Sequence, residues 1–271
     1  MANKLNKTQI KLVQEMLNKH YKFNLLVDGD AGKKTQFALQ QVPFIPMHWP
    51  LERQLVGFIQ HACMLEGINA GPLDGYWGPQ TDYGAELLSV KAKGQQPKPW
   101  RDDEGIGAKP ERRRNAWPNQ VQADLVKYYG AVGTNQTKIQ LPYAVKLAWN
   151  LEKTLTSYSC HEKVADSMGR VLTRVVDHYD ITGIKKLGLD LWGGCLNVRA
   201  MRGGTKYSTH SWGIAVDWDP ARNQLRWGKN KAKFSKGDYD MWWKLWEDEG
   251  WTSLGRRRDY DWMHVQAANV K

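Results

Sequence analysis

The pattern of apolar residues in residues 1–90 predicts a small helical unit. Ile10, Val13 and Leu17 follow a helical period, and Ile59 and Cys63 have the same spacing further along the chain. Each of these stretches is followed by an Asp-Gly turn, a second glycine, a threonine three residues later, and another helix-like stretch. Two helix–turn–helix units are therefore expected.

The two turns form a weak internal repeat, in which the segment Val27 to Thr35 aligns with the segment Leu73 to Thr81. Upstream of the turns, Val13-Gln14 matches Ile59-Gln60 at the same offset. Aromatic residues on the second turn either stack on sugars or enter a minor core, and the sequence leaves both roles open. The candidate ligand-binding residues of this unit are Asp28, Gly29, Asp74, Gly75, Tyr76 and Trp77.

The remainder of the chain mixes helical and strand patterns. Amphipathic helices are predicted at residues 162–179 and 238–250, and short strands at residues 214–218 and 262–266. The apolar stretch at residues 141–149 predicts a further helix that starts after a proline. Because these elements do not alternate as strand–helix–strand, we expect an α+β domain with a small antiparallel sheet.

Residues 91–117 read as a linker. This stretch is rich in glycine and proline, contains the run Glu111-Arg112-Arg113-Arg114, and has no sustained apolar period. The expected organisation is a helical domain over residues 1–90, the linker, and an α+β domain over residues 118–271.

Composition narrows the class of function. The chain has 14 Trp, which often line clefts for carbohydrate or peptide, and its formal charge of +11 favours anionic partners. Its three cysteines, Cys63, Cys160 and Cys195, have no CxxC spacing, which argues against a disulfide framework and a thiolate zinc cluster. The N-terminus has no signal-peptide pattern, and no apolar run is long enough to cross a bilayer.

Two histidines and several carboxylates indicate metal chemistry. His210 is followed by Asp217, and His264 lies further along in an Asp-x-x-His motif. A catalytic zinc site needs three nitrogen or oxygen ligands and one open position for water, and these three side chains supply that set. A lone histidine is usually structural, but the combination of these spacings is much more restrictive.

Asp261, three residues before His264, is the candidate general base, because a carboxylate near the metal must accept a proton from the attacking water. A straight strand would place the two side chains on opposite faces, so this assignment requires a bend. Asp219 and Asp259 are alternative carboxylates. Gly213 allows the backbone to turn between His210 and the following strand.

These motifs resemble two known families. The segment from Leu55 to Leu88 is similar to the peptidoglycan-binding repeat of wall hydrolases, and the first copy is a looser match. The second half resembles the zinc DD-peptidase superfamily, which includes D-Ala-D-Ala carboxypeptidases, dipeptidases and phage L-alanyl-D-glutamate endopeptidases. The family pattern S-x-H-x-x-G-x-A-x-D followed by E/D-x-x-H maps without a gap onto Ser208, His210, Gly213, Ala215, Asp217, Asp261 and His264.

The resemblance implies further roles. An arginine before the histidine motif stabilises the oxyanion in this family, and Arg199 fits that place best, with Arg202 as the fallback. Ser208, Trp212 and Trp262 flank the ligands, and we expect the two tryptophans to pack the site. Aspartate at the base position gives mild support for an endopeptidase over a carboxypeptidase.

The sequence therefore predicts a phage-type endolysin that uses Zn²⁺ to cut a stem-peptide bond of bacterial peptidoglycan, with L-Ala–D-Glu preferred. Alternatives are a D,D-carboxypeptidase or cross-link endopeptidase, and a non-catalytic wall-binding protein. Nucleic-acid binding ranks low because no recognised motif accompanies the positive charge. We expect a monomer that is not inserted in a membrane and stays in the host cytoplasm until lysis.

Overall fold

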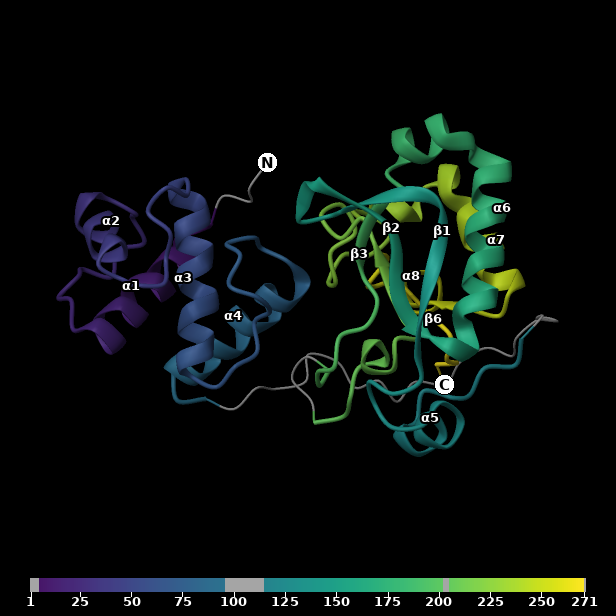
Figure 1. Cartoon of the computed structure of the whole chain (residues 1–271), viewed down its shortest axis with the longest axis horizontal. Coiled ribbons are helices and arrows are strands. Elements are labelled where there is room, and N and C mark those ends of the chain that lie inside the picture. The colour runs from purple at the N-terminus through teal and green to yellow at the C-terminus, as the bar shows by residue number, and fades with distance from the viewer. Residues whose placement is uncertain (1–4, 96–114, 202–204, 271) are drawn as a thin grey trace. The chain divides into compact units, whose positions relative to one another are not determined.

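A computed structural model describes residues 5–95, 115–201 and 205–270. The chain divides into two compact units, Met1–Pro97 and Lys98–Lys271 (Figure 1). The division falls inside the expected linker. Both ends of that expected linker are nevertheless structured, because one helix continues to Ala92 and Trp117 is buried in the core of the second unit. None of the helices in the described ranges is long and apolar enough to cross a membrane.

The first unit consists of two helix pairs, as the repeat predicted. The helices are α1 (Lys7–Tyr21), α2 (Lys33–Gln40), α3 (Leu51–Leu65) and α4 (Pro79–Ala92). Asn6 caps α1 in a capping box with Gln9, in which each side chain binds the backbone amide of the other residue. Both pairs contribute to one apolar core, which includes Leu17, Leu39 and Phe58.

One glutamine in each repeat holds the turn. The Nε2 of Gln14 donates to Asp28 Oδ1 (2.8 Å) and to Thr35 Oγ1 (3.2 Å), and its Oε1 accepts from the Gly29 amide (2.9 Å). The second repeat has the same arrangement, because the amide of Gln60 binds the second Asp-Gly turn and the hydroxyl of Thr81. The repeat seen in the sequence is therefore also a repeat of buried hydrogen bonds.

These bonds give most of the candidate wall-binding residues a structural role. Asp28, Gly29, Asp74 and Gly75 bind the turn glutamines. Tyr76 and Trp77 are half-buried. The ring of Tyr76 stacks on the Arg53 guanidinium at 4.4 Å, and Trp77 donates to Asp82 at 3.1 Å.

The second unit is an α+β domain with a six-stranded sheet. The strands are β1 (Gln136–Leu147), β2 (Asn150–His161), β3 (Leu191–Gly194), β4 (Ala215–Trp218), β5 (Thr252–Ser253) and β6 (His264–Gln266), in the spatial order β2-β1-β3-β4-β6-β5. The α+β class is as predicted, but the sheet is mixed because β1 pairs with β3 in parallel. The long α6 (Glu162–Leu187) connects β2 to β3 and makes this parallel pairing possible.

The predicted helix at residues 141–149 is wrong, because most of this stretch belongs to β1. Tyr143, Val145 and Leu147 are buried while the residues between them are exposed, which is the alternation of a strand. Pro142 lies in the irregular part of the β1–β2 ladder between Gln140 and Val145. A proline is tolerated there because the ladder is interrupted and does not need the amide hydrogen that proline lacks.

The other predicted helices are present. Helix α6 begins at Glu162 and continues past residue 179 to Leu187, through a kink at Asp180. Helix α7 (Asp240–Asp248) places Trp242, Trp243 and Trp246 in the core, as expected. Two further helices, α5 (Gln122–Tyr129) and α8 (Leu254–Arg258), complete the unit. Tryptophan therefore forms much of this core.

Candidate metal centre

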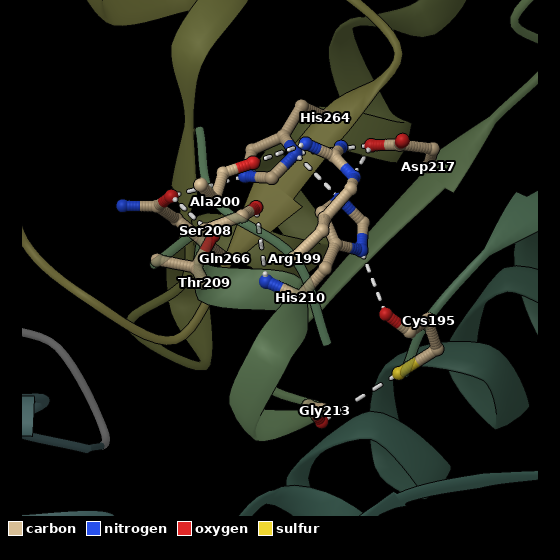
Figure 2. A network of polar contacts seen from close by, with 10 residues as sticks. All are labelled: Cys195, Arg199, Ala200, Ser208, Thr209, His210, Gly213, Asp217, His264 and Gln266. Carbon is tan, nitrogen blue, oxygen red and sulfur yellow. Dashed lines mark hydrogen bonds and ion pairs between the residues drawn. The ribbon is translucent and has the colours of Figure 1, made fainter. Parts of the chain in front are cut away.

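His210, Asp217 and His264 come together from three elements. His210 lies in the short 3-10 helix η1 (Thr209–Trp212), Asp217 on β4 and His264 at the start of β6. Strands β4 and β6 are antiparallel, and their register places Asp217 directly opposite His264. All three side chains are buried, and within the described residues they form a group able to hold a metal ion. The close-up in Figure 2 shows this group.

The loop before β4 brings His210 to the same place. Ser208 caps η1 through a hydrogen bond from the His210 amide (3.4 Å), and Gly213 ends η1 with a φ of 68°. A Cβ at Gly213 would meet the Gln136 side chain and lie 3.1 Å from the His161 backbone nitrogen, so both the conformation and the space favour glycine. The predicted turn at Gly213 is present, and β4 begins two residues later at Ala215.

The distances within the group match those between zinc ligands. His210 Nε2 lies 3.2 Å from His264 Nδ1 and 3.3 Å from Asp217 Oδ1, and the third separation, between His264 Nδ1 and Asp217 Oδ1, is 3.0 Å. Ligands in a tetrahedral zinc site with bonds of about 2.0–2.1 Å are roughly 3.3 Å apart. The three atoms thus fit three corners of a zinc tetrahedron.

Each imidazole is fixed through its other nitrogen. His210 Nδ1 contacts the carbonyl oxygen of Cys195 at 2.7 Å, and His264 Nε2 contacts Gln266 Oε1 at 3.0 Å. Both partners are acceptors, so these two ring nitrogens carry the hydrogens, and His210 Nε2 and His264 Nδ1 keep free lone pairs. This is the tautomer pair that a metal requires.

The charges of Asp217 and His264 shift each other's pKa. Burial opposes ionisation of Asp217, but His210 and His264 outweigh it and hold the pKa of Asp217 well below its usual range. Burial alone lowers the pKa of His264, yet the hydrogen bond and charge of Asp217, together with the charge of Asp261, raise it overall. Without a metal, the raised pKa of His264 favours an additional proton on that imidazole. A bound metal cation can supply the same positive charge in place of the proton.

Asp261 has the bend that its assignment required. It is buried and adopts a φ of 53°, and its carbonyl oxygen accepts from the His264 amide at 3.0 Å. Residues 261–263 therefore form a turn, and β6 begins only at His264. The charge of the Asp261 carboxylate contributes to the raised pKa of His264.

The alternative carboxylates are engaged elsewhere. Asp219 forms an ion pair with Arg222 at 2.6 Å, and burial raises its pKa to about 6. Asp259 accepts from Trp262 Nε1 at 3.1 Å and from the Lys229 amide. Neither belongs to the group of three metal-ligating side chains.

Arg199 belongs to the polar network drawn in Figure 2. Its amide donates to Ser211 Oγ (3.0 Å), its carbonyl oxygen accepts from the Ser208 amide (3.0 Å), and its Nη1 donates to the Ala200 carbonyl oxygen (3.2 Å). These bonds attach Arg199 to the segment that carries His210. The fallback residue Arg202 lies outside the described residues.

The two tryptophans that flank the ligands in the sequence both belong to the buried core of this unit. Trp212 is fully buried and donates through Nε1 to the Gly130 carbonyl oxygen at 2.8 Å. Trp262 is buried against Gly255, where an added Cβ would come within 2.4 Å of its ring.

Sequence reasoning missed two partners of the ligands, the carbonyl of Cys195 and the side chain of Gln266. The first is a backbone group and leaves no trace in the residue type. Gln266 lies two residues after His264, so it shares a strand face with that ligand, and this spacing was an available signal. Searches of protein-family models, of curated proteins and of solved structures find no match to this chain.

Proposed function

We propose that this protein is a zinc-dependent peptidase that hydrolyses a stem-peptide bond of bacterial peptidoglycan, acting as a phage-type endolysin. The observation that carries the proposal is the convergence of His210 Nε2, Asp217 Oδ1 and His264 Nδ1 at separations of 3.0–3.3 Å. Three protein ligands leave one position of a tetrahedral zinc open, which is the arrangement of catalytic sites.

When bound, zinc would lower the pKa of a water in the open position and polarise the scissile carbonyl. The chain's own residues handle the proton. Asp261 accepts it from the attacking water and delivers it to the leaving amine, and the support for this role is the turn that joins Asp261 to His264, in which the Asp261 carbonyl oxygen accepts from the His264 amide at 3.0 Å.

Arg199 supplies positive charge on the segment preceding His210. A guanidinium held there stabilises negative charge that develops on the carbonyl oxygen in the transition state. The support for this role is the position of Arg199 in the family motif, together with its backbone bonds to Ser208 and Ser211.

The choice of substrate rests on the first unit. Its duplicated, glutamine-held turns support the resemblance to peptidoglycan-binding repeats, and a wall anchor suits an enzyme that attacks a polymer. The formal charge of +11 favours anionic envelope polymers. The L-Ala–D-Glu bond is proposed from the resemblance to phage endopeptidases.

Digestion of purified peptidoglycan, followed by mass spectrometry of the fragments, tests this proposal. We expect products that carry a new N-terminal D-Glu, and none from the Asp261→Asn variant. Fragments shortened by a terminal D-Ala, or a cleaved cross-link, would reassign the bond. Intact walls with retained wall binding would favour the non-catalytic alternative.

A further inference from the structure

The amide of Gln266 uses all of its hydrogen-bonding capacity. Gln266 is fully buried on β6, two residues after His264. Its Oε1 accepts from His264 Nε2 (3.0 Å) and from Thr209 Oγ1 (3.2 Å). Its Nε2 donates to Gln120 Oε1 (2.9 Å) and to the Ala268 carbonyl oxygen (3.1 Å). Two donated and two accepted bonds complete the capacity of a primary amide.

The orientation of this amide selects the tautomer of His264. With its NH₂ group held by Gln120 and Ala268, Gln266 must present oxygen to His264 Nε2, which then carries the ring hydrogen. The lone pair of His264 Nδ1 is left facing Asp217 and His210. An inverted amide would present donors instead, and the hydrogen would move to Nδ1, where it blocks metal binding.

Gln120 reaches this network from a distant part of the sequence. It belongs to a short segment, residues 118–122, which we call the strap and which ends at the first residue of α5. The strap is attached to the C-terminal segment, because the Gln120 amide donates to the Asn269 carbonyl oxygen (2.7 Å) and the Asn269 amide donates to that of Pro118 (2.8 Å). Asn119 and Asn269 form a parallel bridge there.

Gln122, two residues later on the strap, provides a comparison. Its amide binds both backbone groups of Tyr207, accepting from the nitrogen (3.0 Å) and donating to the oxygen (3.2 Å). Gln122 therefore attaches the strap to the loop before His210. These bonds are to Tyr207 and not to Gln266 or His264, although Gln122 has the same side chain as Gln120.

We propose that Gln120 is a positioning residue of the metal centre. By holding the amide of Gln266, it keeps His264 in the tautomer that offers Nδ1 to the metal. This inference rests on the proposed metal centre and adds to it a contribution from the strap, which follows the expected linker.

The test compares the full-length protein with Gln120→Ala, Gln120→Glu and Gln122→Ala. The zinc dissociation constant is measured by competition with a chromogenic chelator. We expect Gln120→Ala to weaken zinc binding by about tenfold, the lower end of the effect of outer-shell partners. Gln120→Glu retains an oxygen acceptor for Gln266 and should restore binding, while Gln122→Ala should leave it within about twofold of wild type.

A second readout reports the tautomer directly. In zinc-free protein above the pKa of His264, ¹⁵N chemical shifts of the imidazole distinguish a hydrogen on Nε2 from one on Nδ1. Wild type should show the Nε2 form, and Gln120→Ala a mixture of both forms. Visible absorption of the cobalt-substituted protein should differ from wild type in Gln120→Ala but not in Gln122→Ala, because only the first variant alters how His264 is held at the metal.

The outcomes separate this inference from the proposed function. If the wild-type chain binds no zinc, the proposed metal centre fails, and the tautomer measurement still decides the role of Gln120. If wild type binds zinc but Gln120→Ala has the same affinity and the same tautomer, the inference is wrong and the centre stands. An equal loss in Gln122→Ala would show that docking of the strap matters, and would also overturn the role of Gln120.

Discussion

Replacing Gln60 by Met should strongly destabilise the first unit. Gln60 is almost completely buried, and its amide makes five hydrogen bonds to the second turn and to Thr81. Methionine has a similar length and keeps the apolar contacts, but it has no amide. The substitution therefore isolates the hydrogen bonds from the packing.

The cost follows from the groups that lose their partners. The Gly75 amide, 2.8 Å from Gln60 Oε1, is the main one, whereas the Tyr76 carbonyl oxygen keeps bonds from the Gly78 amide (3.1 Å) and the Thr81 hydroxyl (3.4 Å). An unsatisfied buried amide costs about 1–3 kcal/mol, and the bonds lost by groups that keep other partners raise the total to about 2–4 kcal/mol. A unit of roughly 90 residues has about 5–13 kcal/mol of stability, of which this is a large fraction.

Hydrogen exchange of the full-length protein measures this loss separately for each unit. Amides in α1 and α3 should exchange about 30- to 1,000-fold faster in Gln60→Met, since 1.4 kcal/mol is a factor of ten. Amides of α6 in the second unit serve as the internal reference. Gln14→Met should have a comparable effect because Gln14 makes the equivalent bonds, and Gln41→Met, at an exposed position, should have none. If exchange in Gln60→Met is accelerated less than threefold, the hydrogen bonds of Gln60 do not stabilise the first unit to the extent expected.

Three further predictions concern the metal centre. Asp261→Asn should lower the rate of wall hydrolysis by about 10²–10⁴ while zinc content, measured by atomic emission, stays at the wild-type level; loss of zinc would instead make Asp261 a ligand. Gly213→Ala should lower the free energy of unfolding by about 1–2 kcal/mol and should lower the melting temperature, because a φ of 68° disfavours a side chain and the added Cβ would meet Gln136. An unchanged melting temperature would contradict this expectation. The raised pKa of His264 stabilises the zinc-free protein fully below its unfolded pKa of about 6.5, and the contribution is lost as pH rises through the folded pKa. The depressed pKa of Asp217 acts oppositely, with its contribution lost as pH falls below about 4. His161, whose pKa burial lowers, acts in the opposite direction over the same pH range, so the comparison is made with a His264→Gln variant. In urea unfolding of zinc-free protein, wild type should lose more stability between pH 6 and pH 8.5 than this variant, and zinc should reduce the difference.

The fold was predictable where one period dominated the sequence. The apolar stripe of α6 and the tryptophan face of α7 identified those helices, and the Asp-Gly turns identified the repeat of the first unit. Residues 141–149 were misassigned because their proline suggested the start of a helix. The alternation of Tyr143, Val145 and Leu147 was the better signal, and it agrees with the burial in β1.

The site was predictable as far as residue type and spacing carry information. The motif singled out His210, Asp217 and His264, and the structure brings their ligand atoms together. The supporting shell could not be predicted in the same way. The bond between Gln266 and Gln120 joins residues 146 positions apart, and an amide pair has no sequence pattern of its own.

The most direct test of the account is the zinc content and the wall-lysis rate of one purified sample, measured before chelation, after chelation and after zinc is restored. We expect about one zinc per chain, loss of lysis on chelation and recovery with zinc. Absence of bound metal, or lysis that is indifferent to chelation, would contradict the metal centre at His210, Asp217 and His264.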